Sequence, residues 1–119
     1  MAYIIDLPTF SDERGSLTVI ENLLPFDVKR FYYIYNAVVK RGGHRHKKNM
    51  QALICLSGSC EVYVNIRGDE EFFLLNVPDK CLILNPEDWH IMDKFSESAT
   101  LLVFASEFYN SDDYIDEPY

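Results

Sequence analysis

The stretch Arg41–Ile66, RGGHRHKKNMQALICLSGSCEVYVNI, decides the fold. It contains three short β-rich segments, at residues 44–47, 50–56 and 60–65, separated by polar or glycine-containing turns. The triplet at residues 57–59, Ser-Gly-Ser, is typical of a hairpin turn, so the second and third segments should pair as antiparallel strands. Apolar residues do not recur at helical spacing, which argues against a helical bundle.

The same pattern continues on both sides of this stretch. Further strands are expected at residues 3–6, 16–21, 29–36, 71–76, 81–84, 89–92 and 99–105, and a short helical turn near 111–114. Turn-forming Gly, Pro, Asn and Asp residues separate them. About ten short strands at this spacing predict one all-β domain over residues 1–119, built as a sandwich or barrel.

Composition limits the classes of function. The 119 residues are 48% hydrophobic and 25% charged, which is the usual balance for a globular domain. The net charge of −8 disfavours a general binder of nucleic acid or of anionic membranes. No apolar run approaches the roughly 18–20 residues that cross a bilayer, and the N-terminus lacks a signal-peptide pattern. We therefore expect a cytoplasmic protein.

The cysteines carry no recognisable motif. Cys55, Cys60 and Cys81 show no CxxC spacing, and the first two lie within or beside apolar runs. They are expected to be small buried hydrophobic residues of a reducing compartment rather than ligands or nucleophiles.

One segment of this acidic chain is strongly basic. Five cations lie within nine residues: Lys40, Arg41, Arg45, Lys47 and Lys48. Such a concentration suggests a site for a small anion, although a solvated surface loop would explain the charges alone.

Two histidines lie inside the basic segment. In an extended strand residues two apart face the same way, so His44 and His46 should project together, into one cavity if that face points inward. Gly42 and Gly43 before them allow the backbone to turn sharply. The pair fits either metal ligation or acid/base catalysis. A metal needs a third and often a fourth ligand, for which only His90 and the poorer ligand Gln51 are at hand.

Acid/base chemistry suits the pair better. The ordinary histidine pKa of about 6.5 lets each imidazole both accept and donate a proton near neutral pH. Two of them on one face can serve two adjacent carbons of a substrate. Arg41 could hold a phosphate or stabilise a developing oxyanion. The sequence contains no GxGxxG pattern for a nicotinamide cofactor.

Six segments in order along the chain allow a comparison with known families. They are DERGSL at 12–17, VKRFYYI at 28–34, RGGHRHK at 41–47, CLSGSC at 55–60, WH at 89–90, and the spaced residues AS, Y and DYI over 105–115. Together they resemble the nucleotide-sugar 3,4-ketoisomerases that act on dTDP-4-keto-6-deoxyglucose, a family of the cupin superfamily. Gln51 stands where metal-binding cupins usually have Glu, and Arg45 stands where the ketoisomerases usually have Ala.

The resemblance implies a cupin jelly-roll barrel, a homodimer with exchanged N-terminal strands, and tautomerisation without a metal or other cofactor. It implies that His44 and His46 are catalytic, and it places Tyr33 and Arg14 at the substrate. We count Tyr33 with the catalytic candidates, and Arg14 with Arg41, Trp89 and His90 as the candidates for substrate binding. The product would serve deoxyamino-sugar biosynthesis for bacterial surface polysaccharides.

The expected reaction begins when one histidine removes the C3 proton of a 4-keto-6-deoxyhexose. Protonation of the resulting enediol(ate) at C4 leaves the ketone at C3. We expect His44 to be the carbon base and His46 to move the hydroxyl proton, with Tyr33 as the candidate that assists it. The residues leave open dTDP, UDP or GDP as the nucleotide and either configuration at C4.

Two other functions fit the same residues. A metal-dependent cupin, such as a dioxygenase, would use His44, His46 and His90 as ligands. A non-catalytic sugar-nucleotide-binding module would keep the pocket without turnover, for example if Arg45 filled it. Strand alternation instead sends the Arg45 side chain to the face opposite the two histidines.

Overall fold

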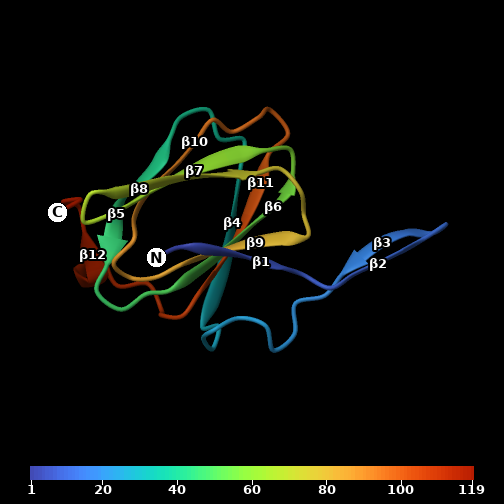
Figure 1. The fold of residues 1–119 in the computed structure, drawn as a ribbon, viewed down its shortest axis with the longest axis horizontal. Coiled ribbons are helices and arrows are strands. Elements are labelled where there is room, and N and C mark those ends of the chain that lie inside the picture. The colour runs from blue at the N-terminus through green and yellow to red at the C-terminus, as the bar shows by residue number, and fades with distance from the viewer.

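The computed structural model describes residues 1–119 and contains two five-stranded antiparallel sheets that face each other (Figure 1). The first sheet has the order β1 (Tyr3–Asp6), β9 (Lys80–Leu84), β6 (Gln51–Ser57), β11 (Thr100–Ala105), β4 (Arg30–Tyr35). The second has the order β12 (Tyr114–Ile115), β5 (Arg41–His46), β10 (Trp89–Asp93), β7 (Cys60–Ile66), β8 (Asp69–Leu75). The only helical element is a 3-10 turn, η1 (Ser111–Asp113). This architecture is a jelly roll, so the predicted fold class is confirmed.

The core lies between the two sheets. Leu53, Leu82 and Leu101 of the first sheet pack against Val62 and Val64 of the second, and all five are buried. Each has its neighbours along the strand on the opposite face, as the period of two requires. Burying five such side chains stabilises the fold by about 1.5–3 kcal/mol each before conformational entropy is counted.

Strand β6 is buried on both of its faces. Its outward residues Ala52 and Ile54 are covered by Ile20, Leu24 and Phe26, which belong to the irregular segment between β3 and β4. This second layer explains why β6 is continuously apolar where a one-sided strand would alternate. The three cysteines are free and buried, which confirms their interpretation as small core residues. The chain has no helix long and apolar enough to span a membrane.

A glycine sets the spacing between β5 and β10. Gly42 has a φ of 91°, and a Cβ there would lie 2.9 Å from the backbone oxygen of His90. A bulge in the ladder follows His90, and His90 stands directly opposite His44. The glycine and the bulge therefore bring the two strands into the register that faces these histidines toward each other.

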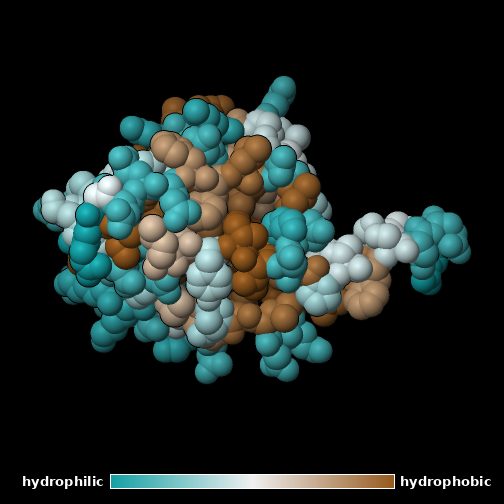
Figure 2. All heavy atoms as spheres, viewed as in Figure 1, coloured by the Kyte–Doolittle hydropathy of each residue, from teal (hydrophilic) through white to brown (hydrophobic).

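A hairpin projects from the body of the molecule. Its strands are β2 (Thr9–Asp12) and β3 (Gly15–Thr18), which pair only with each other. Figure 1 shows this arm at the opposite end of the long axis from β12, and Figure 2 shows its polar tip extending into solvent. The arm has no sheet partner within its own chain. An isolated two-stranded hairpin is at best marginally stable in water, so the arm needs a further packing contact.

Candidate active site

Three histidines meet at the open end of the barrel beside β12. His44 lies with its ring centroid 5.0 Å from that of His46 and 5.0 Å from that of His90. One ring nitrogen from each lies within 4.8 Å of the others. The predicted common face of His44 and His46 is therefore confirmed, and β10 adds the third imidazole. All three rings present nitrogen atoms to the same small space.

His46 is held by a carboxylate from the C-terminal region. Its Nδ1 lies 2.9 Å from Oδ2 of Asp113, in η1. The backbone N–H groups of Lys48 and Asn49 also donate to this carboxylate, at 2.8 and 3.3 Å. The carboxylate therefore fixes the imidazole orientation and directs Nε2 of His46 away from itself, where it is buried and has no hydrogen-bond partner.

His90 is oriented in a similar way. Its Nδ1 lies 3.0 Å from the backbone oxygen of Asp88 and donates to it, which leaves Nε2 buried and unpartnered. Buried polar atoms are almost always hydrogen-bonded, so the two vacant Nε2 atoms mark a place where a bound molecule would supply the partner.

Burial keeps the histidines neutral. It lowers the pKa of His44 to about 4, with a smaller contribution from the neighbouring His46. Burial also lowers the pKa of His90 to about 3. The pKa of His46 is lowered by burial too, but Asp113 opposes that shift. At neutral pH all three can accept a proton or a metal ion, and His46 has the partner that best supports basicity.

A cavity of about 330 Å³ opens beside His44. It is lined by Arg30, Tyr32, Ile34, Arg41, Gly42, His44, Met92, Tyr109 and Tyr114. Arg30 is a fixed cation in this wall, because its Nε donates to the backbone oxygen of Glu107 at 3.0 Å and its guanidinium lies 5.4 Å from the Tyr32 ring. The Tyr32 hydroxyl accepts a hydrogen bond from buried Gln51 at 3.0 Å.

The structure places Tyr33 outside this site. Tyr33 is 58% exposed and lies with Tyr35 on the outer face of β4. Its neighbour Tyr32 points inward instead. Contrary to expectation, Tyr33 therefore does not line the cavity of its own chain, and Tyr32 is the tyrosine that could touch a molecule bound there. The reason is strand phase, because consecutive side chains point to opposite faces.

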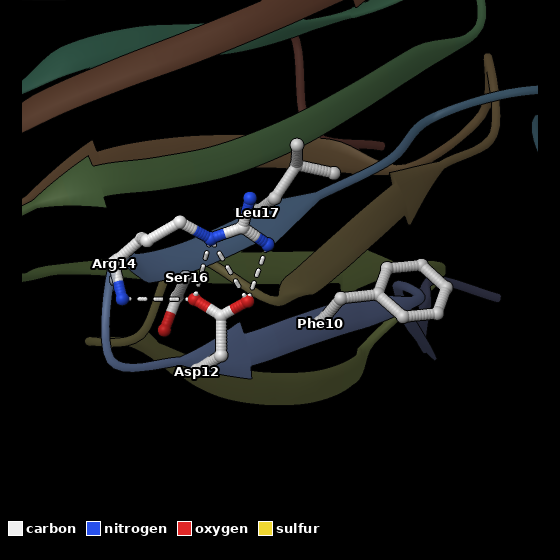
Figure 3. A pocket seen from close by; sticks show the side chains of 6 residues that line it. Phe10, Asp12, Arg14, Ser16 and Leu17 are labelled. Carbon is white, nitrogen blue, oxygen red and sulfur yellow. Dashed lines mark hydrogen bonds and ion pairs between the residues drawn. The ribbon is translucent and has the colours of Figure 1, made fainter.

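Two other expected residues also lie apart from the cavity. Trp89 is on the face of β10 opposite His90, where its indole Nε1 donates to the backbone oxygen of Asp116. It neither lines the cavity nor plugs the barrel. Arg14 is on the projecting arm, where its guanidinium pairs with Asp12 and remains 85% exposed (Figure 3). Arg41, by contrast, lies at the cavity as expected.

Four site residues were not foreseen from the sequence: Arg30, Tyr32, Asp113 and Tyr114. The Tyr114 ring lies 4.7 Å from the rings of both His44 and His46 and so covers them from one side. On charge alone, an acidic segment such as residues 106–119 is expected to be a solvated surface. The aromatic residues mixed with its acids are the signal that it packs, because a purely solvated segment would not need them.

We expect the buried His90 to make folding stability depend on pH. Its pKa in the folded state is about 3, against about 6.5 in the unfolded chain. As pH falls through 6.5, the unfolded state binds a proton that the folded state does not, so stability falls by about 1.4 kcal/mol per pH unit from this group alone. Urea unfolding at several pH values between about 6.5 and 4.5 measures the slope. In His90→Gln the slope should become shallower by about that amount; an unchanged slope would contradict the assignment.

Comparisons with known proteins agree with this geometry. The family model FdtA, described as WxcM-like, C-terminal, matches residues 1–119. A TDP-4-oxo-6-deoxy-alpha-D-glucose-3,4-oxoisomerase of Aneurinibacillus thermoaerophilus is 39% identical over 116 residues, which are 94% of this chain and 84% of that protein.

Solved structures give the same result. A 3,4-ketoisomerase from Helicobacter canadensis is 41% identical, with a TM-score of 0.92 over 98% of this chain and 90% of that one. A histidine-to-asparagine variant of the 3,4-ketoisomerase QdtA from Thermoanaerobacterium thermosaccharolyticum was solved with TDP-4-keto-6-deoxyglucose. It is 40% identical, with a TM-score of 0.94 over 98% of this chain and 87% of that one.

Proposed function

The chain belongs to the FdtA family, and on that basis we propose that it is a 3,4-ketoisomerase of a TDP-linked 4-keto-6-deoxyhexose. The family gives the reaction type, and the residues of this chain must supply the chemistry. The observation that carries the proposal is the His46–Asp113 pair beside His44, because it places an imidazole supported by a carboxylate 5.0 Å, between ring centroids, from His44, which lines the cavity.

His46 is the carbon base in this mechanism. Its Nε2 is unpartnered and its Nδ1 is bonded to the Asp113 carboxylate, which stabilises the imidazolium that forms when the C3 proton is taken. His44 lacks a carboxylate partner, and its pKa of about 4 makes it the weaker base. This assignment reverses the expectation that His44 is the carbon base, an order that spacing along the strand does not settle.

Removal of the C3 proton leaves an enediolate across C3 and C4. The guanidinium groups of Arg30 and Arg41 line the cavity and favour negative charge on the sugar oxygens. His44, which also lines the cavity, passes the hydroxyl proton from the C3 oxygen to the C4 oxygen. The His46 imidazolium then gives a proton to C4, which leaves the ketone at C3 and returns His46 to its neutral form, so the atoms of substrate and product are the same.

Tyr32 and Tyr109 support the substrate from the wall of the cavity. Gln51 donates to the Tyr32 hydroxyl, which leaves that hydroxyl free to donate to a sugar oxygen. Tyr109 is 67% exposed at the mouth, and its ring lies 5.8 Å from the Arg30 guanidinium. An exposed ring beside a cation suits the base and diphosphate of a nucleotide sugar.

Proton NMR in D₂O tests the activity. Chelator-treated enzyme incubated with dTDP-4-keto-6-deoxyglucose should remove the C3 proton signal and give a 3-keto sugar with deuterium at C4. Equivalent UDP and GDP sugars in parallel define the nucleotide. No exchange with any of them, before or after metal addition, would contradict the proposal.

A metal-dependent reaction is the second candidate, and one observation favours it. The three histidines place ligand atoms within 4.8 Å of one another, and His46 and His90 have the outer hydrogen-bond partners typical of metal ligands. These residues would hold a divalent ion such as Zn²⁺ or Fe²⁺, which would polarise a carbonyl oxygen. Metal analysis of purified protein, and turnover before and after chelation, separate the two candidates.

The projecting arm exposes apolar side chains that a second copy of the chain would cover. Phe10 and Leu17 are cross-strand partners in β2 and β3 and are 66% and 58% exposed; both side chains extend from the hairpin (Figure 3). We propose that the arms exchange in a homodimer, which buries these side chains and carries Arg14 toward the partner's cavity. The reduced cysteines and the nucleotide-sugar substrate suit a cytoplasmic enzyme that supplies deoxyamino-sugar synthesis.

Sedimentation tests the arm exchange. The native chain should sediment at twice its mass of 13.9 kDa, and the double variant Phe10→Asp, Leu17→Asp should sediment as a monomer, because burying two carboxylates at an apolar interface is strongly unfavourable. Phe72→Asp is the matched control, since Phe72 is a similarly exposed phenylalanine on β8. A monomeric native chain, or a control that dissociates equally, would contradict the exchange.

A further inference from the structure

The last four residues, 116–119, lie against the face of the second sheet that points away from the histidines. Trp89 on β10 donates its indole N–H to the backbone oxygen of Asp116 at 2.8 Å. Arg45 on β5 donates from Nε to the backbone oxygen of Glu117 at 3.1 Å. These bonds go to backbone atoms, so they fix the path of the chain rather than one side chain.

The final residue is held separately. The Tyr119 hydroxyl donates to the backbone oxygen of Glu87. The Arg45 guanidinium lies 4.2 Å from the centroid of the Tyr119 ring, and the Arg67 guanidinium, in the turn between β7 and β8, lies 5.6 Å from it. Two cations on one aromatic ring form favourable cation–π contacts. Residues 116–119 are therefore attached to the second sheet and its turns at several points.

These attachments lie directly beside the candidate active site in the chain. Strand β12 has only two residues, and it pairs Tyr114 with His46 and Ile115 with Arg45. The Tyr114 ring packs edge-on against both His44 and His46. So short a strand has little stability of its own. Asp113 anchors its upstream end through its bonds to His46, Lys48 and Asn49, and the contacts of residues 116–119 anchor its downstream end.

We propose that residues 116–119 form a C-terminal latch, and that Arg45 and Trp89 are positioning residues that act through it on Tyr114. The latch holds the Tyr114 ring against the two imidazoles and so limits their movement and their contact with water. Its effect on turnover rests on the proposed function, but its existence does not. The latch gives a role to Arg45 and Trp89, neither of which lines the cavity.

Amide hydrogen exchange tests the latch without reference to activity. In the full-length variants Arg45→Ala and Trp89→Phe, the amides of Tyr114 and Ile115 should exchange at least about tenfold faster than in the native chain, because the strand loses its downstream anchor. The histidine imidazole signals in NMR spectra should shift in the same variants. Lys47→Ala is the matched control, since it removes an exposed cation beside β5 whose side chain forms no hydrogen bond or ion pair. Unchanged exchange in both latch variants would overturn the proposal.

Turnover tests whether the latch acts through Tyr114. Arg45→Ala and Trp89→Phe should each lower kcat about fivefold with little change in KM, since small misplacement of catalytic groups slows the chemical step. In a Tyr114→Ala background, Arg45→Ala should have no further effect on kcat. If the two losses multiply instead, Arg45 acts by another route and the proposal fails.

The two proposals fail in different ways. A native enzyme that converts no nucleotide sugar would refute the proposed function, and the exchange and NMR measurements would still decide whether the latch exists. A native enzyme that turns over normally, with latch variants whose tails are freed and whose kcat is unchanged, would refute the latch alone.

Discussion

His46→Asn lowers kcat by about 10²–10⁴-fold and abolishes the exchange of the C3 proton with D₂O, since that is the usual contribution of a positioned general base. Asparagine keeps the approximate size and can still donate toward Asp113, but it cannot take a proton from carbon. Substrate binding should change little, because the cations and tyrosines of the cavity are untouched. The loss is therefore expected in kcat and not in KM.

The exchange measurement makes this prediction specific. Recovered substrate is examined for deuterium at C3, and product formation is followed in the same tube. Asp113→Asn is the graded comparison, because it keeps the shape of the pair and removes the charge that supports the imidazolium; its kcat should lie between those of the native enzyme and His46→Asn. Near-normal exchange in His46→Asn would rule out His46 as the carbon base.

The strands and their hairpin could be predicted because local patterns determine them. Alternating or continuous apolar runs bounded by turn residues gave β6, β7, β9 and β10 within one or two residues of their observed ends. Strands β2 and β12 were missed, because both are short and largely exposed and their pairing depends on the tertiary fold. The nearly continuous apolar run at 99–105 would suit a strand buried on both faces; in β11 alternate residues are fully buried and the others only partly so.

The phase of β4 shows where sequence reasoning stops. Because side chains along a strand alternate between two faces, Phe31, Tyr33 and Tyr35 share one face of β4, and Tyr32 and Ile34 share the other. Both faces are aromatic, however, so hydropathy does not say which one points inward. The structure shows that the face formed by Tyr32 and Ile34 points inward, because both side chains line the cavity. The local sequence is therefore equally consistent with Tyr33 and with Tyr32 as the tyrosine that faces the cavity.

Asp113 was out of reach for a different reason. It lies 67 residues from His46 in the chain, and their contact depends on the path of residues 106–113 across the end of the barrel. On composition alone an acid among other acids in a C-terminal segment is a solvated surface group. Only the tertiary fold distinguishes Asp113, whose carboxylate accepts from His46 and two backbone amides, from its exposed neighbour Asp112.

His44→Asn should separate the two proton transfers. If His46 removes the C3 proton and His44 moves the hydroxyl proton, the variant still forms the enediolate, which returns to substrate by reprotonation at C3. Deuterium should then appear at C3 of recovered substrate at close to the native rate, while product formation falls by about 10²-fold or more, as expected for loss of one acid/base group.

The pair of variants assigns the roles by opposite signatures. His46→Asn should lose exchange and turnover together, and His44→Asn should lose turnover alone. If His44→Asn also loses exchange while His46→Asn retains it, His44 is the carbon base, and the carboxylate behind His46 serves orientation rather than basicity. Because both imidazoles belong to one cluster with ring centroids 5.0 Å apart, distance alone does not distinguish them. The difference lies in the Asp113 partner, which only one of the two possesses.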